Sequence, residues 1–363
     1  MVFRFSPLAV CGVMAMSAKL DISEGFQKEA EREIRVFTRD WTARDDRIAL
    51  LSYVATFVVY FSGMATALWS WPNLWMALPA IILTAFASVR IYVLQHDCGH
   101  ASLFSTTKRN TWAGYALSVF SLTPFSVMRF NHNEHHTHIG NLDERHTTEI
   151  LTMTLKEWES APLKQRLFYR LYRNPFIMIP VGGFFTYVLA YRWPKNVTKI
   201  GVAEVVLHNI CIAIWVGLIW SGFGLTGVAI YLSTVFLAGG LGVFLVYLQH
   251  NFEDTYWDRK PDLNYAQAAL QGASALDLGW WFDLAVANIT YHDIHHFNAN
   301  IPSYRLRNCH LALREKYDVP TIGWREAFRS FTLKLWDEDA GRLVPYPKAR
   351  APQAATALRT MSQ

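Results

Sequence analysis

Residues 73–100 carry the pattern that decides the fold, and they read NLWMALPAIILTAFASVRIYVLQHDCGH. Positions 73–95 contain a single charge, Arg90, and form a stretch long enough to cross a bilayer as a helix, which takes roughly 20 apolar residues. The stretch ends directly in His96 and His100, and their i, i+4 spacing puts both imidazole rings on one face of a helix. A membrane-spanning helix that delivers two histidines to the membrane surface is therefore predicted.

The rest of the chain repeats this apolar character. With 52% hydrophobic and 17% charged residues, it is too apolar for an ordinary soluble enzyme. Two weaker stretches, 111–127 and 175–193, are expected to be interfacial or re-entrant, since Pro180 interrupts the second. We expect an all-α integral membrane fold with a cytoplasmic helical cap and four transmembrane helices, paired in two hairpins: 48–71, 73–95, 200–221 and 225–249.

The distribution of Lys and Arg predicts the topology. Of the 34 basic residues, segments 1–47, 96–199 and 251–363 hold 8, 12 and 13, and only Arg90 remains. Under the positive-inside rule these segments lie in the cytoplasm, so the formal charge of +5 needs no nucleic acid to explain it. The predicted organisation is a cytoplasmic segment 1–47, a membrane domain 48–325 and a cytoplasmic tail 326–363.

Histidine clustering is the main chemical signal in the sequence. The chain has 13 histidines, and eight of them fall into three short boxes with H-x-x-x-H, H-x-x-H-H and H-x-x-H-H spacing. In a helical H-x-x-H-H box two rings lie along one face, and the adjacent ring points sideways toward a neighbouring metal. The eight are His96, His100, His132, His135, His136, His292, His295 and His296.

Each box taken alone can be explained without a metal, as solvent-exposed histidines at a helix end or as a chance cluster on the surface. All three boxes, however, lie at the cytoplasmic ends of predicted elements, so the topology brings them to one membrane face. Imidazole binds Fe, Zn, Cu and Ni, so the ligand type does not select the metal. Eight or nine histidines exceed the three or four ligands of one zinc ion, which favours a site for two metals.

The boxes resemble those of the membrane fatty acid desaturase superfamily, and the resemblance extends beyond them over residues 40–325. It is closest to bacterial acyl-lipid desaturases, and it implies that the eight box histidines and a ninth ligand bind two Fe ions. The stretches that carry this resemblance outside the first box are HHTHIGNLD at 135–143, RLYRNP at 170–175, QHNFED at 249–254 and HFNANIP at 296–302.

The resemblance also implies the reaction and the partners of the chain. We expect an O2-dependent desaturase that introduces a double bond into a fatty-acyl chain, with a lipid-linked acyl group as its substrate. The H-P-G-G haem motif of a fused cytochrome b5 does not occur in the sequence, so a separate ferredoxin or cytochrome b5 type protein is expected to supply electrons. The expected location is the bacterial inner membrane, with the active site on the cytoplasmic face.

His250 is the predicted ninth ligand. Two hairpins that start in the cytoplasm return the chain there at Gln95 and again at Gln249, so His96 and His250 follow equivalent helix ends. The alternative is an interfacial histidine that is hydrogen-bonded to water or to Asp254. Within the third span, His208 lies one turn from Glu204, and a local hydrogen bond between the two is expected.

Several carboxylates near the boxes are candidates to accept the free N–H of a ligating imidazole, although each is as readily explained as a solvated side chain. They are Asp97, Glu134, Asp143, Asp254 and Asp293.

Two rival functions share parts of this pattern. A membrane di-iron hydroxylase of an acyl chain, alkane or other lipid would use the same ligands and differ only in its product. A carrier of metal or haem would need polar residues along a path through the membrane, whereas the predicted spans are nearly free of them.

Overall fold

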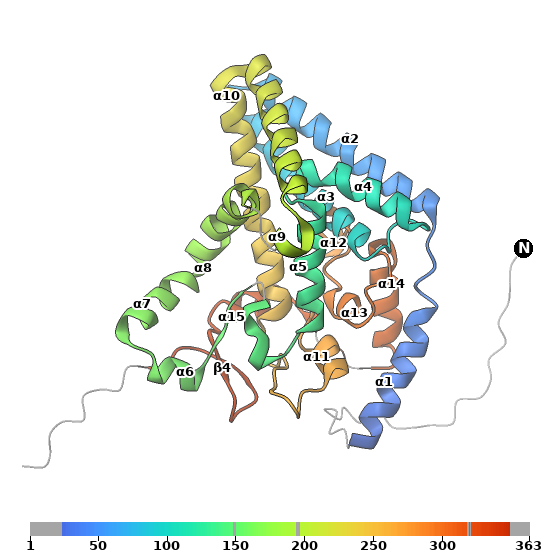
Figure 1. Cartoon of the computed structure of the whole chain (residues 1–363), viewed down its shortest axis with the longest axis vertical. Coiled ribbons are helices and arrows are strands. Elements are labelled where there is room, and N and C mark those ends of the chain that lie inside the picture. The colour runs from blue at the N-terminus through green and yellow to red at the C-terminus, as the bar shows by residue number, and fades with distance from the viewer. Residues whose placement is uncertain (1–23, 148–149, 194–196, 318, 320, 349–363) are drawn as a thin grey trace, which may run out of the picture.

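The computed structural model describes residues 24–147, 150–193, 197–317, 319 and 321–348, and within these it is mostly helical (Figure 1). The outermost parts of the predicted N-terminal segment and C-terminal tail, 1–23 and 349–363, therefore lie outside the described residues. The elements run in this order: α1 (Glu24–Arg39), α2 (Asp46–Ser70), α3 (Leu74–Gly99), α4 (Thr107–Ser121), α5 (Phe125–Thr137), η1 (Leu142–Thr147), β1 (Met153–Thr154), α6 (Leu155–Ser160), α7 (Leu163–Tyr172), α8 (Pro175–Ile177), η2 (Met178–Gly182), η3 (Phe185–Leu189), η4 (Ala190–Arg192), α9 (Val197–Ile200), α10 (Ala203–His250), α11 (Tyr265–Gln271), β2 (Ala275–Leu276), α12 (Trp280–Ala285), α13 (His292–Phe297), α14 (Ser303–Arg314), β3 (Thr321–Ile322), α15 (Trp324–Ser330), β4 (Leu335–Asp337) and β5 (Arg342–Val344).

Helices α2 and α3 form the first predicted hairpin. Asp45 caps the start of α2 by accepting the N–H groups of Arg47 and Ile48, and a short turn separates the end of α2 from Leu74. The two helices pack closely, because a Cβ atom on Gly63 would lie 2.5 Å from Oγ1 of Thr84. Both helices are long and apolar enough to cross a membrane.

Helix α10 contains both halves of the second predicted hairpin. It is recorded as one element of 48 residues, but Gly224 inside it has φ 59° and ψ −152°, which no continuous α-helix adopts. Figure 1 shows the chain rising to the top of the molecule and returning from it as the two halves of α10. The break lies where the sequence predicts the turn, between 200–221 and 225–249.

Three helices in the described part of the chain are candidate membrane spans, namely α2, α3 and α10. A further candidate is the bent pair of α7 and 175–192, whose two parts meet at 54°. This bent segment packs on α10, since a Cβ atom on Gly183 would come within 2.3 Å of the backbone of Gly239. The irregular, partly π-helical backbone of 178–189 agrees with the prediction that 175–193 is not a straight helix.

Outward-facing side chains on these helices are strongly apolar. Leu51, Val58, Leu207 and Leu225 are between 59% and 71% exposed, although each is a large hydrophobic residue. Such surface is unfavourable in water and is expected where a protein faces lipid. The structure is therefore that of a membrane protein.

Short helices and small sheets fold over the histidine-bearing ends of α3 and α10. One sheet has the order β1-β4-β5, with β1 parallel to β4 and β4 antiparallel to β5, and the other pairs β2 with β3 in parallel. The prediction of a purely α-helical fold missed these strands because each has only two or three residues, too few for an alternating pattern. Ile91, Leu94, Leu248 and Ile294 belong to the main core, which thus joins the membrane helices to this covering layer.

Candidate metal centre

The nine histidines proposed from the sequence come together in two groups. Within each group, every residue offers a ligand atom that lies within 4.8 Å of all the others. Group one contains His96, His100, His132, His136 and His295, and group two contains His135, His250, His292 and His296.

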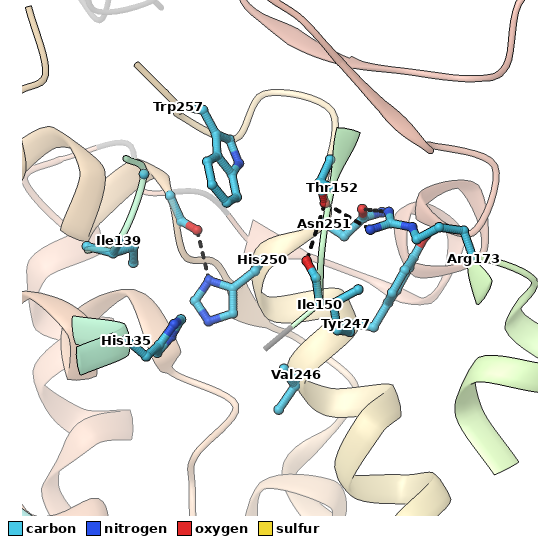
Figure 2. Close-up of a pocket in the computed structure, with 12 residues that line it drawn as sticks. His135, Ile139, Ile150, Thr152, Arg173, Val246, Tyr247, His250, Asn251 and Trp257 are labelled. Atoms are coloured by element: carbon cyan, nitrogen blue, oxygen red, sulfur yellow. Dashed lines mark hydrogen bonds between the residues drawn. The ribbon is translucent and has the colours of Figure 1, made fainter. Parts of the chain in front are cut away.

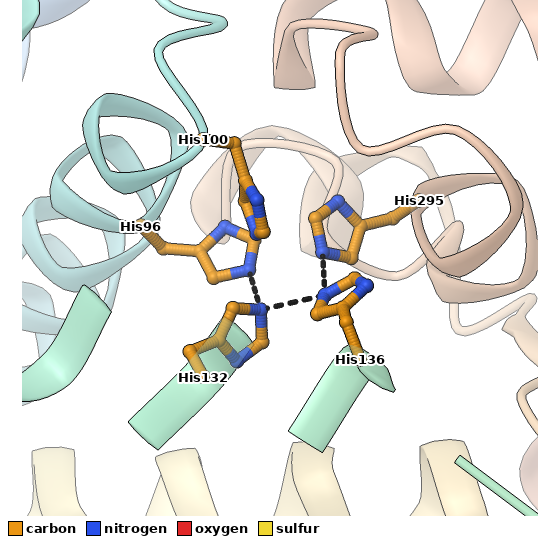
Figure 3. A group of neighbouring side chains, drawn as sticks. All are labelled: His96, His100, His132, His136 and His295. Carbon is orange, nitrogen blue, oxygen red and sulfur yellow. Dashed lines mark hydrogen bonds between the residues drawn. The ribbon is translucent and has the colours of Figure 1, made fainter. Parts of the chain in front are cut away.

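Group one gathers rings from three helix segments (Figure 3). The Nε2 atom of His132 lies 2.7 Å from Nε2 of His96 and 2.8 Å from Nε2 of His136, which in turn lies 3.0 Å from Nε2 of His295. A ring nitrogen carries either one proton or one lone pair, so the Nε2 of His132 cannot complete two such contacts as good hydrogen bonds. A metal ion among these nitrogens would instead accept one lone pair from each ring.

Group two is built in the same way at the end of α10. The Nε2 atom of His292 lies 3.1 Å from Nε2 of His250 and 3.0 Å from Nε2 of His296, and Nε2 of His135 lies 3.3 Å from that of His296. The Nδ1 atom of His250 lies 3.0 Å from the carbonyl oxygen of Gly272 (Figure 2). Because that carbonyl can only accept a hydrogen bond, the ring proton is on Nδ1. The Nε2 atom then has a lone pair, which faces the other histidines of the group.

The two H-x-x-H-H boxes divide their ligands in opposite ways. Helix α5 gives the i, i+4 pair His132 and His136 to group one and the middle histidine, His135, to group two. Helix α13 gives its i, i+4 pair to group two and its middle histidine, His295, to group one. The groups are neighbours, because the rings of His136 and His296 stack with centroids 4.2 Å apart.

Burial keeps these rings in the form that binds metal. For five histidines on α5 and α13, burial first and the neighbouring histidines second hold the pKa well below its ordinary value. Imidazole binds a metal in its neutral form. These rings are already neutral at neutral pH, so they do not have to release a proton when a metal binds. The five are His132, His136, His292, His295 and His296.

Comparison of the sequence with known proteins identifies the family of this chain. The sequence model of the family described as fatty acid desaturase matches residues 70–327, a stretch that includes both groups. This chain belongs to the fatty acid desaturase family.

Curated relatives of this chain are also named as desaturases. A fatty acid desaturase of Bacillus subtilis is 31% identical over 330 residues, which cover 88% of this chain and 91% of the relative. An sn-1 oleoyl-lipid 12-desaturase of Synechocystis is 27% identical over 67% of this chain and 70% of its own length. A chloroplastic sn-2 acyl-lipid omega-3 desaturase (ferredoxin) of Helianthus annuus is 26% identical over 70% of this chain and 59% of its own length. The protein is therefore a desaturase, an oxidoreductase.

Buried glutamines precede the two histidines that end membrane helices in this desaturase. The Nε2 atom of Gln95 donates to the carbonyl of Thr123 at 2.8 Å, and that of Gln249 donates to the carbonyl of Ile289 at 2.7 Å. Each amide thereby ties the end of a membrane helix to a loop of the covering layer. The parallel between Gln95 and Gln249, which is visible in the sequence, has a structural counterpart.

The carboxylates near the boxes behave differently from the sequence expectation. Asp97 lies 3.6 Å from Nδ1 of His96, beyond hydrogen-bond distance, and accepts the N–H of Ser303 at 2.7 Å instead. Asp293 accepts a hydrogen bond from the buried His310, with 2.8 Å between Oδ2 and Nδ1, and not from a box histidine.

Away from the histidine groups, Asp143 pairs with Arg259 on the surface. These carboxylates were candidates to orient imidazoles, and at His250 the backbone carbonyl of Gly272 has this role.

Arg173 supports group two and was not identified as a site residue from the sequence. It is fully buried, and its guanidinium donates to Oγ1 of Thr152 at 2.9 Å and to Oδ1 of Asn251 (Figure 2). It also donates to the carbonyl of Leu151. Arg173 and Asn251 both lie in stretches that carried the family resemblance, 170–175 and 249–254. Because Asn251 directly follows His250, this contact fixes the chain beside a candidate ligand.

The expected hydrogen bond between His208 and Glu204 is absent. The Nε2 atom of His208 bonds the carbonyl oxygen of Ser118 at 2.9 Å, and its Nδ1 lies 3.2 Å from Arg192. Glu204 accepts the backbone N–H of Ser126 at 2.6 Å. These partners come from segments that pack beside α10, so the proximity of the two residues along the helix did not determine their bonding.

Proposed function

We propose that this desaturase acts on acyl chains of membrane lipids and that the nine histidines hold two Fe ions, one in each group. The observation that carries the proposal is the division of the nine side chains into sets of five and four, each compact enough for one ion. A single metal could not use ligands from both sets with ordinary geometry, since one ion takes at most about six ligands.

The nine histidine side chains suit bound metal ions, and an unpaired buried ring nitrogen supports this. The Nε2 atom of His100, a member of group one, is buried and has no hydrogen-bond partner among the described residues. Buried polar atoms without a partner are costly, and a bound metal with its ordered surroundings would remove that cost. Iron held by these imidazoles would supply the oxidising power, with O2, to remove hydrogen from an unactivated methylene.

The protein's own part in the reaction is placement and the exclusion of water. Its helices α3, α5, α10 and α13 converge so that the rings are already gathered, and little rearrangement is needed on metal binding. Beside group two, a cavity of ≈ 30 Å³ lined by His135, His250 and Tyr247 has room for only a few water molecules. A substrate methylene near these groups would thus lie in largely dry surroundings.

Lipid-linked substrate is proposed from two observations. Several relatives are named as acyl-lipid desaturases, among them those of Synechocystis and Helianthus annuus. Each group also has members at the end of a membrane helix, His96 and His100 at the end of α3 and His250 at the end of α10. An acyl chain that remains attached to a membrane lipid can reach such a position without leaving the bilayer.

The proposed topology has four spans, with the two halves of α10 as the third and fourth, and the histidine groups in the cytoplasm of a bacterial cell. A cysteine introduced at Lys164 should react with impermeant reagent only after the membrane is opened, whereas one at Gly222 should react in intact cells. The reverse pattern would refute this orientation.

A separate electron donor of ferredoxin or cytochrome b5 type is part of the proposal, and the relative from Helianthus annuus names ferredoxin. The whole proposal is tested by expression in a host that lacks desaturases. Mass spectrometry should then find new double bonds at one position in its membrane lipids, and elemental analysis should find about two irons per chain. Hydroxylated lipids alone, or stoichiometric zinc with iron-independent activity, would overturn it.

A further inference from the structure

We propose that an open basic pocket beside group one binds the phosphate of the phospholipid substrate and so determines which carbons reach the metals. The proposal rests on the lipid-linked substrate proposed above. The pocket measures ≈ 610 Å³ and lies between the end of α3, one side of α5 and the segment α9. Gly99, Arg129, Asn133 and Lys199 contribute to its walls.

Two positive charges face the pocket. The guanidinium of Arg129 lies 5.5 Å from the ring centre of Phe125, and the ammonium of Lys199 lies 4.7 Å from the ring centre of Phe130. Neither cation forms an ion pair with a carboxylate in the part of the chain that the structure describes. Aromatic contacts therefore hold both side chains without neutralising them.

The carboxylate of Glu204 lies beside the wall of the pocket but pairs with neither cation. Its Oε1 atom accepts the backbone N–H of Ser126, another wall residue, at 2.6 Å. This bond also ties the start of α10 to the start of α5. The two cations are left to face an anion that the protein does not itself supply.

The position of the pocket relative to the lipid indicates a headgroup. Lys199 lies three residues before Val202, and from there large apolar side chains face outward along α10, including Val206, Leu207 and Ile210. On the other side in sequence, Trp193 is 76% exposed. Exposed tryptophan and lysine next to a lipid-facing helix mark the depth of lipid headgroups, where phosphate is the abundant anion.

Helix α5 links this pocket to the metal centre. Arg129 and Asn133 lie one turn apart on α5, and the same helix carries His132 and His136 of group one. Gly99 of the opposite wall directly precedes His100. A phosphate bound here would hold the glycerol end of the substrate at a fixed distance from group one, because Arg129 and His132 lie on one rigid helix, about 4.5 Å apart along its axis.

This arrangement makes a specific prediction about the product. If the headgroup is the anchor, the double bond is counted from the carboxyl end, and its position stays the same when the acyl chain is lengthened. Releasing the anchor should spread the double bond over neighbouring positions and slow turnover of phospholipid.

The experiment compares the wild type with Arg129→Gln/Lys199→Gln in nanodiscs, with iron and electron donor supplied. The lipids are phosphatidylglycerol and uncharged diacylglycerol with identical acyl chains of two lengths. The double variant should lose about tenfold or more of its rate on phosphatidylglycerol, the effect of losing one or two charge-assisted bonds, and should be unchanged on diacylglycerol. Lys164→Gln/Lys316→Gln removes two charges from exposed sites elsewhere and should match the wild type.

A measurement without turnover accompanies these rates. Native mass spectrometry should show that the wild type retains phosphatidylglycerol more strongly than diacylglycerol, and that the double variant shows no preference. Arg129→Lys/Lys199→Arg, which keeps both charges, should retain the preference and guards against misfolding of the first variant.

Three results separate the possible failures. Equal wild-type rates and retention for both lipids would overturn the phosphate site but leave lipid desaturation intact. A variant that slows on both lipids and needs more electron donor would assign the pocket to the donor and also overturn the proposal. Wild-type activity on acyl-CoA or acyl carrier protein and on no lipid would instead refute the proposed substrate.

Discussion

The two histidine groups differ in how they are held, although both consist of imidazoles alone. Group one has five members, and its membrane helix α3 contributes two of them, His96 and His100. Group two has four members, and its membrane helix α10 contributes only its last residue, His250. Group two depends more on contacts around the end of that helix, namely the Gly272 carbonyl and the bond between Arg173 and Asn251.

The histidine pairs of the boxes are positioned by a local helical motif, whereas His250 is positioned by the tertiary fold. The i, i+4 pairs of the boxes meet because a helix places them on one face, whatever surrounds it. His250 meets His292 only because two segments 42 residues apart are packed together. Group two should therefore be the more sensitive to changes outside the ligands, and the following predictions test that expectation.

The largest effect is expected from removing one ligand of each group. His132→Ala and His292→Ala should each abolish desaturation and lower the iron content from about two to about one per chain, and the double variant should hold almost none. Elemental analysis of anaerobically purified protein measures the iron. If His132→Ala alone removed all iron, group two could not hold iron by itself, and the assignment of one ion to each group would be wrong.

The ninth ligand is tested by His250→Ala. This variant should lose the iron of group two and all desaturation but keep the iron of group one, as read from elemental analysis and lipid mass spectrometry. His138→Ala is the matched control, because His138 Nδ1 bonds only the carbonyl of Glu134 in its own helix turn. Full iron and a wild-type rate in His250→Ala would remove His250 from the ligand set.

A smaller effect is expected from Arg173→Met, which keeps the ligands but removes the buried bonds around Asn251. Loss of such supporting contacts typically costs 10–100-fold in metal affinity, and here it should fall on group two more than on group one. Titration with a competing chelator measures the two affinities. Arg166→Met, which removes a more exposed arginine from the same helix, should leave both unchanged, and equal weakening of the groups by Arg173→Met would contradict the comparison.

The smallest effect concerns pH. Burial, and then the charge of Arg173, lower the pKa of Lys334 to about 7, and Lys334 donates to the carbonyl of Arg173 at 2.7 Å. Between pH 7 and the pKa of about 10.4 in the unfolded chain, the unfolded state binds more protons, so stability should rise with pH. The slope is at most about 1.4 kcal/mol per pH unit for this single proton.

Thermal unfolding in detergent at pH 7, 8 and 9 measures this slope. Lys334→Met should flatten the pH dependence over that range. An unchanged slope in the variant would show that other groups produce it.

Much of this molecule could be predicted from its sequence, because the strongest signals are local. Apolar length gives α2 and α3, and the glycines near 224 give the break in α10. Because two hairpins return the chain to the side where it started, His250 is predicted on the same side of the membrane as the three boxes. The structure places it beside His292. The covering layer was anticipated only as a helical cap.

The parts that escaped prediction depend on contacts between distant segments. Arg173 and Asn251 are 78 residues apart, and His208 and Ser118 are 90 apart, so no periodicity connects them. The opposite division of the two H-x-x-H-H boxes also depends on how α5 and α13 face each other. The H-x-x-H-H spacing predicts which rings lie on the same face of a helix, but it does not predict which of the two groups that face joins.

Sharing of α5 and α13 between the groups has a consequence for how the enzyme matures. Helix α13 has only six residues, too few to persist alone in water, yet it supplies ligands to both groups. Filling one group fixes this helix in place and so prepares its remaining rings for the other. Metal uptake should then be cooperative, so newly made enzyme should bind its second iron more tightly than its first.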